Sequence, residues 1–289
     1  MSIISLIFRH YAKKGGREAE KSLKEPQNIE KIRNISYGNE GKWNLMDVYY
    51  PKGTEGKLPT IVNVHGGGYV YGTKEESRFY CMDLATRGFT VVNFSYRLAP
   101  KAKFPSPLAE TNEVMKKIAK NPEYFHMDLG NLFMTGDSAG AQIASQYCAL
   151  LTSPDYAKLF GFDMAEVKIK AAAFNCGMYR DFYKLKPVQL MYDYFGKDEK
   201  RHGEKLDVWK YITPAFPPSF VMSAANDFLL AEARPFAEFL KSRGVETVCR
   251  IYGGKEQSEY CHVFHTNIAS EEAKQCNDEE CAFFRKFVH

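Results

Sequence analysis

The sequence lacks the patterns of a membrane-spanning, disulfide-linked or nucleic-acid-binding protein. No run of about 18 apolar residues occurs in its 289 positions, so no membrane-spanning helix and no stable membrane insertion are expected. The seven cysteines form no C-x-x-C pair, which disfavours a disulfide framework or a zinc site and favours reduced thiols in the cytoplasm. Charge of one sign is scarcely in excess, at 39 basic and 35 acidic residues, so no nucleic-acid partner is expected.

What the sequence contains is a regular alternation of short apolar runs with helix-length segments. This alternation predicts βαβ units in one α/β domain over 1–289, with a mainly parallel central sheet and helices on both faces. Residues 33–38 and 45–50 are expected to form an outer strand pair. The runs expected to form core strands are 60–65, 89–95, 131–135, 168–175, 219–225 and 247–252. The segments expected to form helices are 74–87, 107–120, 139–151, 231–243 and 270–287.

The N-terminal segment carries apolar residues at helical spacing. These residues are Ile3, Ile4, Ile7, Phe8 and Tyr11. The spacing predicts a short amphipathic helix whose apolar face packs on its own domain, with docking on a membrane surface as the alternative. The basic residues follow the apolar ones rather than preceding them, so a secretory signal is not expected.

A second segment, residues 178–212, interrupts the alternation and is rich in aromatic residues. It is too long for a simple loop between two core strands, so a helical insertion over one end of the sheet is expected. Its aromatic residues either pack a helix against the core or line a pocket.

The strongest motif is Gly136-Asp137-Ser138-Ala139-Gly140, placed between a predicted strand and a predicted helix. A sharp strand-to-helix turn of this kind, a nucleophile elbow, raises a serine hydroxyl above the sheet. Only very small residues fit two positions before and two positions after the serine, because the strand and the helix lie very close together there. The motif predicts Ser138 as a nucleophile. Asp137 is not expected to serve as its base, because adjacent side chains of the elbow diverge.

A run of three glycines, Gly66 to Gly68, directly follows the strand at 60–65. Consecutive glycines let backbone N–H groups face open space, where they can stabilise an oxyanion. The expected donors are Gly67, Gly68 and Ala139. A flexible turn is the alternative; a phosphate-binding loop is disfavoured because the P-loop and G-x-G-x-x-G spacings are absent.

A serine nucleophile requires a base and a carboxylate that orients the base. Of the four histidines after the serine, His202 lies in the aromatic-rich segment and His289 is the last residue, whereas His262 and His265 both follow the last predicted strand. His262 is favoured because it lies nearer to that strand and is followed by apolar residues that could anchor the loop. Asp227 stands at the end of the preceding strand, where its carboxylate could accept a hydrogen bond from the imidazole. The alternative for Asp227 is a helix N-cap, and for either histidine a surface or capping role.

At these motifs the sequence resembles the hormone-sensitive-lipase-like family of α/β-hydrolases, from about residue 33 to the end. The resemblance also includes Tyr96-Arg97-Leu98-Ala99-Pro100 with Phe104-Pro105, a segment for which the residues alone suggest only a structural connection. It implies an α/β-hydrolase fold, a carboxylesterase acting on short or medium acyl esters, and a helical cap from 1–30 and 178–212. The sequence departs from the family pattern in three places: at Lys101, in the residues that follow Asp227, and in the loop at 253–260. These departures affect the shape of the pocket.

Together these features predict a serine carboxylesterase that uses Ser138, His262 and Asp227, with no metal or organic cofactor. Its expected partner is a small-molecule ester, and a homo-oligomer is possible. Three alternatives stay open: an amidase or formamidase with the same residues, a sugar-ester deacetylase, and a non-catalytic binding protein on the same fold.

Overall fold

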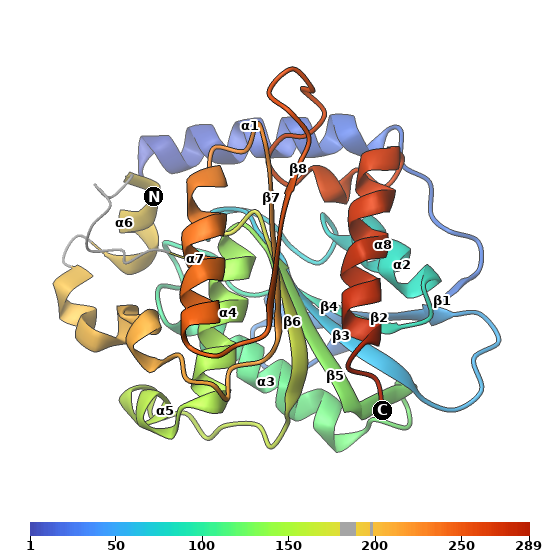
Figure 1. Ribbon diagram of the computed structural model, residues 1–289, viewed down its shortest axis with the longest axis horizontal. Helices are drawn as coiled ribbons and strands as arrows, with labels where there is room; N and C mark the ends of the chain where they lie inside the picture. The colour runs from blue at the N-terminus through green and yellow to red at the C-terminus, as the bar shows by residue number, and fades with distance from the viewer. Residues whose placement is uncertain (180–188, 197–198) are drawn as a thin grey trace.

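A central eight-stranded sheet organises the computed structural model, which describes residues 1–179, 189–196 and 199–289 (Figure 1). The strand order is β1-β2-β4-β3-β5-β6-β7-β8. β2 pairs antiparallel with β1 and β4, and the other pairings are parallel. The strands are β1 (Ile29–Ser36), β2 (Leu45–Pro51), β3 (Leu58–Val64), β4 (Thr90–Phe94), β5 (Met127–Asp137), β6 (Ile169–Asn175), β7 (Ser219–Ala224) and β8 (Thr247–Tyr252).

Helices cover both faces of this sheet, as the alternating pattern predicts. The α-helices are α1 (Ile3–Glu20), α2 (Arg78–Thr86), α3 (Ser106–Lys120), α4 (Ala139–Thr152), α5 (Pro154–Phe160), α6 (Gln189–Phe195), α7 (Leu230–Ser242) and α8 (Glu271–Arg285). Short 3-10 helices are η1 (Gly41–Asn44), η2 (Glu199–Leu206), η3 (Val208–Tyr211) and η4 (Phe264–Thr266). Helices α4 and α7 lie on one face of the sheet and α2 and α8 on the other (Figure 1).

The hydrophobic core forms two layers, one on each face of the sheet. Every residue of β4 is buried, and so are the last five of β3, because parallel strands covered on both sides have no solvent-facing positions. These runs therefore contain consecutive β-branched residues rather than an alternation of apolar and polar ones. The layering leaves the loops at the carboxyl ends of the strands to carry chemistry.

The α/β class and the six core strands are confirmed, with differences at element boundaries. β5 begins four residues before the predicted strand, and α5 was not predicted. α2 begins at Arg78 rather than near residue 74, because Lys74 is held by β2 instead of continuing a helix: its ammonium group pairs with Asp47 at 2.9 Å. All seven cysteines are free.

Helix α1 is longer than predicted, and its apolar face points toward solvent rather than toward the domain. Ile3, Ile4, Ile7 and Tyr11 are exposed, so the prediction that these residues pack on the domain is wrong; only Phe8 is partly covered. Phe8 packs against the core, and polar contacts also hold the helix. The hydroxyl of Ser5 donates to Asp193 of α6, and the Arg9 guanidinium donates to the carbonyls of Val70 and Ala99. These bonds turn the apolar residues away from the protein.

The described part of the aromatic-rich segment is largely helical, as predicted, and contains α6, η2 and η3. Residues 180–188 and 197–198 of this segment lie outside the described residues. Its aromatic rings pack against the rest of the domain. Tyr194 stacks on Tyr69 with ring centroids 4.0 Å apart, and Trp209 stacks on Phe239 at 4.4 Å. Among the described helices, none combines the length and apolar character needed to cross a bilayer.

Candidate active site

Ser138 occupies the sharp turn between β5 and α4. Its φ of 52° and ψ of −117° lie outside the regions that a serine normally adopts, which costs about 1–3 kcal/mol and requires support from its surroundings. The flanking glycines explain how the turn fits. A Cβ on Gly136 would stand 2.6 Å from the carbonyl oxygen of Gly140, and a Cβ on Gly140 would stand 2.0 Å from that of Val64. Strand and helix can approach this closely only through glycine.

The structure brings the three predicted side chains into one hydrogen-bonded series. Nε2 of His262 lies 3.0 Å from Oγ of Ser138, and Nδ1 of His262 lies 2.7 Å from Oδ1 of Asp227. Ser138 follows β5, Asp227 follows β7, and His262 stands in the connection after β8. Parallel strands end at the same edge of the sheet, which is why residues so far apart in sequence meet there. Both ends of the imidazole are therefore engaged, as a general base acting on a serine requires.

Asp227 is held as a carboxylate by several donors. Besides His262, the hydroxyl of Ser223 donates to Oδ2 at 2.7 Å and the N–H of Leu229 donates to Oδ1 at 2.8 Å. Burial alone would raise the pKa of Asp227, but these hydrogen bonds and the interaction with His262 hold that pKa below its ordinary value. The carboxylate therefore stays charged and can stabilise a protonated imidazole.

The other candidate histidine is placed differently. His265 is fully buried with its ring edge-on to Tyr80, and neither ring nitrogen has a hydrogen-bond partner within the described part of the chain. Burial lowers the pKa of His265 to about 3. A neutral, enclosed imidazole cannot take a proton from Ser138, so the preference for His262 agrees with the geometry. His202 is bonded to the carbonyl of Phe195 and lies in the aromatic-rich segment.

The three-glycine loop provides backbone donors that have no acceptor of their own. Gly67 has φ 111°, and a Cβ there would stand 2.1 Å from the carbonyl oxygen of Tyr71; Gly68 has φ 57°. Within the described residues, the N–H groups of Gly67 and Gly68 make no hydrogen bond. The N–H of Ala139 opens α4, where no intrahelical acceptor exists. These are the donors that the sequence suggests for an oxyanion.

Asp137 joins the glycine loop to the turn that carries Ser138. Its Oδ1 accepts the N–H of Gly66 at 2.9 Å. The residue keeps some exposed surface, but protein encloses its carboxyl group, and this burial raises the pKa of Asp137 to about 6. Its role in the geometry is to fix the loop against the elbow, and as expected it does not contact the serine as a base.

The segment beginning at Tyr96 supports the same loop, a role that its residue types alone did not indicate. The Tyr96 hydroxyl donates to the carbonyl of His65 at 2.7 Å, and the two rings stack with centroids 4.1 Å apart. The N–H of Ala99 donates to the carbonyl of Tyr69 at 2.9 Å. Burial lowers the pKa of His65 to about 4, so this ring is neutral. The segment is a brace for the glycine loop.

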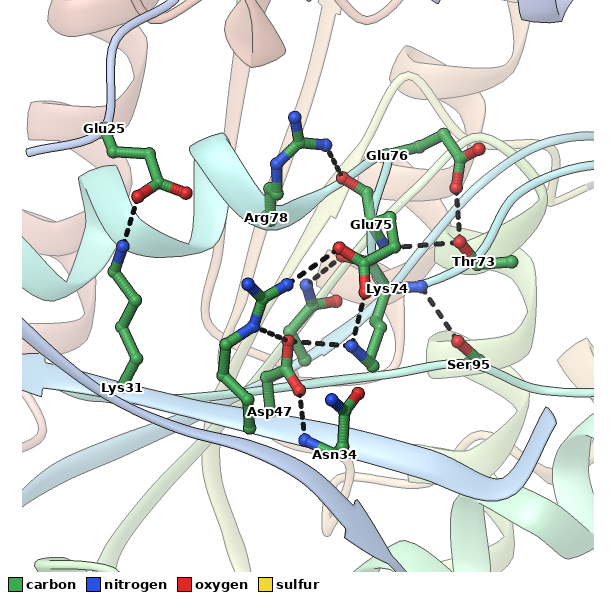
Figure 2. A network of polar contacts seen from close by, with 12 residues as sticks. Glu25, Lys31, Asn34, Asp47, Thr73, Lys74, Glu75, Glu76, Arg78 and Ser95 are labelled. Atoms are coloured by element: carbon green, nitrogen blue, oxygen red, sulfur yellow. Dashed lines mark hydrogen bonds and ion pairs between the residues drawn. The ribbon is translucent and has the colours of Figure 1, made fainter. Parts of the chain in front are cut away.

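The chain that leaves the glycine loop is anchored by a buried ion pair. Figure 2 shows Lys74 beside Asp47 of β2, with 2.9 Å between Nζ and Oδ2. The N–H of Asn34 donates to the same carboxylate at 2.8 Å, and the N–H of Lys74 donates to the hydroxyl of Ser95 at 3.0 Å. Both charged side chains are almost completely buried. The pair fixes where the loop rejoins the sheet.

A second buried network stands behind Ser138. The N–H of Ser138 donates to the carbonyl of Asn175 at 2.8 Å. The Asn175 side chain in turn donates to Glu280 of α8 at 3.0 Å, and the Tyr80 hydroxyl donates to the same carboxylate at 2.9 Å. Burial raises the pKa of Glu280. The position of Asn175 at the end of β6, beside β5, is the only sequence signal that could have indicated this contact.

Cys176, directly after β6, lies beside the catalytic candidates. Its sulfur, an oxygen of Asp227 and a ring nitrogen of His262 lie within 4.8 Å of one another, and within the described ranges these are the one set of His, Cys and carboxylate groups close enough to share a metal ion. His262 and Asp227 are already bonded to each other, and burial raises the pKa of the Cys176 thiol well above its usual value. The donor set therefore suits a hydrogen-bonded relay better than a metal site.

Comparison with known proteins agrees with this architecture. A family model described as an alpha/beta hydrolase fold matches residues 61–266, more than half of the chain. The chain belongs to the hormone-sensitive-lipase-like family of α/β-hydrolases. The crystal structure of esterase B from Lactobacillus rhamnosis matches with a TM-score of 0.90 over 98% of this chain and 93% of that one, at 20% identity. At that identity the likeness concerns the fold.

Curated relatives include enzymes with different substrates. The chain is 26% identical over 228 residues to esterase LipQ of Mycobacterium tuberculosis, covering 74% of this chain and 53% of that protein. It is 29% identical over 180 residues to kynurenine formamidase of Salmo salar, covering 62% of this chain and 55% of that protein. The chain therefore spans little more than half the length of these relatives.

Proposed function

We propose that this protein is a serine carboxylesterase acting on small esters with short or medium acyl groups. The observation that carries the proposal is the series Ser138–His262–Asp227, with 3.0 Å and 2.7 Å between successive partners. The unoccupied N–H groups of the glycine loop beside it add support, and so does the esterase named among the relatives.

The first half of the reaction forms an acyl-enzyme. Oγ of Ser138 attacks the ester carbonyl carbon while Nε2 of His262 takes the hydroxyl proton. The carbonyl oxygen becomes an oxyanion, which the N–H groups of Gly67, Gly68 and Ala139 would hold; one such donor typically contributes about 10²–10³ in kcat. His262 then gives its proton to the departing alkoxide, the ester C–O bond breaks, and the alcohol leaves.

The second half of the reaction restores the serine. Water attacks the acyl carbon and gives a proton to Nε2 of His262, and the carboxylic acid leaves as Oγ of Ser138 takes the proton back. Asp227 accepts a hydrogen bond from Nδ1 throughout, which fixes the ring and stabilises its positive charge. The proton therefore moves only between Ser138, His262, water and the substrate.

Helices at the carboxyl ends of the strands would close the substrate site. We infer that α1 and α6, from the segments 1–30 and 178–212, act as a cap. The Ser5 hydroxyl and the N–H of Ser2 both donate to Asp193, which joins the two helices directly. Tyr194 of α6 stacks on Tyr69, directly after the glycine loop.

The test is Ser138→Ala, assayed with p-nitrophenyl acetate and with a fluorophosphonate probe. We expect turnover to fall by at least about 10³-fold and labelling to disappear. Ser145→Ala is the matched control, because Ser145 lies on the same helix and, among the described residues, its hydroxyl bonds only to the nearby carbonyl of Gln142. Unchanged turnover in Ser138→Ala would contradict the proposal. A wild-type protein that reacts with neither reagent would instead favour a non-catalytic binding protein.

A second candidate, amide hydrolysis, is favoured by one observation, the 29% identity to a kynurenine formamidase. The same series of residues can cleave either bond, because both reactions pass through a tetrahedral oxyanion. Comparing kcat/KM on an aryl formamide and on an aryl acetate with the same leaving group distinguishes the two. We expect the ester to be the better substrate; a formamide preferred by more than about tenfold would assign the protein to the amidases.

A further inference from the structure

The outer face of α1 presents an apolar patch to solvent. Ile3 is 75% exposed, Ile4 47%, Leu6 51%, Ile7 51% and Tyr11 67%. Of the eight large apolar side chains exposed in the described structure, six lie in the first eleven residues, since Met1 also belongs to this group. Contiguous exposed apolar residues on a folded protein usually mark a docking surface, whereas single ones do not.

The orientation of this face is fixed. Ser5, the one fully buried residue of α1, bonds to Asp193, and Arg9 bonds to the carbonyls of Val70 and Ala99. Rotating the helix to bury its isoleucines would break these bonds. The patch is therefore held outward by the protein itself.

Positive charge is concentrated beside the patch. Residues 1–24 hold six of the 39 basic residues and two of the 35 acidic ones, so the rest of the chain has 33 of each and no net charge. The whole formal charge of +4 thus lies in and directly after α1. Lys13, Lys14 and Arg17 continue the outward face beyond Tyr11, and they make no ion pair with residues that the structure describes. This charge complements an anionic surface.

The patch also lies at the edge of the protein where chemistry is expected. α1 runs across the carboxyl ends of the strands, the edge from which Ser138, Asp227 and His262 project (Figure 1). At that edge Phe228 is 75% exposed, with its ring 4.2 Å from that of His262. Docking through α1 would bring this edge toward the surface that is bound.

We infer that α1 docks the protein on an anionic lipid surface. The apolar side chains of its first two turns enter the boundary between headgroups and acyl chains, while Lys13, Lys14 and Arg17 contact anionic headgroups. The helix lies along the membrane and does not cross it. The inference concerns binding alone and does not depend on the proposed esterase activity.

The experiment measures co-sedimentation of the full chain with lipid vesicles. We expect binding to vesicles of phosphatidylcholine mixed with phosphatidylglycerol, weaker binding in high salt, and little binding to phosphatidylcholine alone. Ile4→Gln with Ile7→Gln should lower partitioning by at least about 10²-fold, because each buried isoleucine contributes at least about tenfold. Lys14→Gln with Arg17→Gln should lower it about 25-fold, at about fivefold for each charge.

Tyr124→Gln is the matched control. Tyr124 is 66% exposed but precedes β5, at the opposite edge of the sheet, so its replacement should leave partitioning unchanged. Thermal unfolding verifies that each variant is folded. Ser138→Ala should bind vesicles as the wild type does, which separates this test from that of the activity.

Three results would overturn the inference. The wild type could fail to sediment with the anionic vesicles, or Tyr124→Gln could lose as much binding as the α1 variants. The third is a dimer in light scattering that Ile4→Gln with Ile7→Gln converts to a monomer without any effect on vesicle binding. That result would assign the face to a second copy of the chain.

Discussion

The Tyr96 hydroxyl donates to the backbone carbonyl of His65 over 2.7 Å, and the two rings stack almost in parallel, at 7°. His65 is the last residue before the three glycines. The bond therefore fixes the point from which the glycine loop departs, although Tyr96 contributes no group to the proposed reaction. It is a positioning residue.

Replacing Tyr96 by phenylalanine tests this role. The buried carbonyl of His65 would lose its donor, which typically costs about 1–3 kcal/mol of unfolding free energy. We also expect kcat on p-nitrophenyl acetate to fall about tenfold with little change in KM, because the oxyanion donors would be less well placed. Tyr147→Phe is the control, because it also removes a buried hydroxyl, but one that donates at 2.9 Å to Asn112 of α3 rather than to the glycine loop. An equal loss of kcat in both variants would refute a specific effect on the loop.

Gly140→Ala tests the close approach of α4 to β3. The added Cβ would stand 2.0 Å from the carbonyl oxygen of Val64 and 2.6 Å from that of His65, and both are backbone atoms that cannot rotate away. We expect a loss of at least about 3 kcal/mol in urea unfolding, together with loss of activity. Gly15→Ala, a helical glycine with nothing within 4 Å, should instead stabilise the protein by up to about 1 kcal/mol. A stable, active Gly140→Ala protein would disprove the packing described for the elbow.

The carboxyl group of Asp137 predicts a pH dependence of stability. Burial raises its pKa from 3.8 to about 6 in the folded protein, so the folded chain binds a proton more tightly than the unfolded one. The free energy of unfolding that this difference in pKa contributes is fully present below about pH 4 and is lost as the pH rises through about 6. We expect Asp137→Asn to remove about 1–3 kcal/mol of that decline. Urea unfolding of both proteins between about pH 4 and 7 measures this decline. If the free energy of unfolding changed with pH equally in the two proteins, Asp137 would not be its source.

Lys74→Met tests the buried ion pair. The substitution would remove the nearer of two cations from buried Asp47 and leave only the Arg33 guanidinium, which is partly exposed and lies 3.5 Å away. Removing one partner of a buried ion pair typically costs about 3–5 kcal/mol, and we expect a loss toward the lower end of that range. Denaturant unfolding measures the loss. The control is Lys158→Met, which breaks a fully exposed pair with Asp155 at 2.8 Å and should change stability little. If the two variants lost equal stability, the Lys74–Asp47 pair would not be the anchor described here.

The sequence indicated the candidate site well because its geometry follows from topology. Ser138, Asp227 and His262 each follow a different strand of a parallel sheet, and such strands end at one edge. The ends of the predicted strands were therefore enough to expect the three side chains together. The preference for His262 over His265 used its shorter distance from the last strand and the apolar residues that follow it. The family resemblance rests on the same motifs and implies the same residues.

The orientation of α1 and the role of Tyr96 could not be predicted in this way. Apolar residues on one helical face are compatible with packing inward or facing outward. The choice depends on the bond between Ser5 and Asp193, which are 188 positions apart. The bond from Tyr96 spans 31 positions to a backbone atom, for which no residue type gives a signal. Local patterns identify elements, but such distant polar contacts decide how the elements turn.

His262 reaches the serine from the connection after β8, the outermost strand on its side of the sheet. Ser138, by contrast, is set between β5 and α4 in the middle of the fold. Unfolding that starts at this edge of the sheet would withdraw the proposed proton acceptor, His262, while the central strands were still intact. Activity would then be lost at a lower temperature or denaturant concentration than the native secondary structure. The difference between these two midpoints would measure the local stability of the sheet edge at β8.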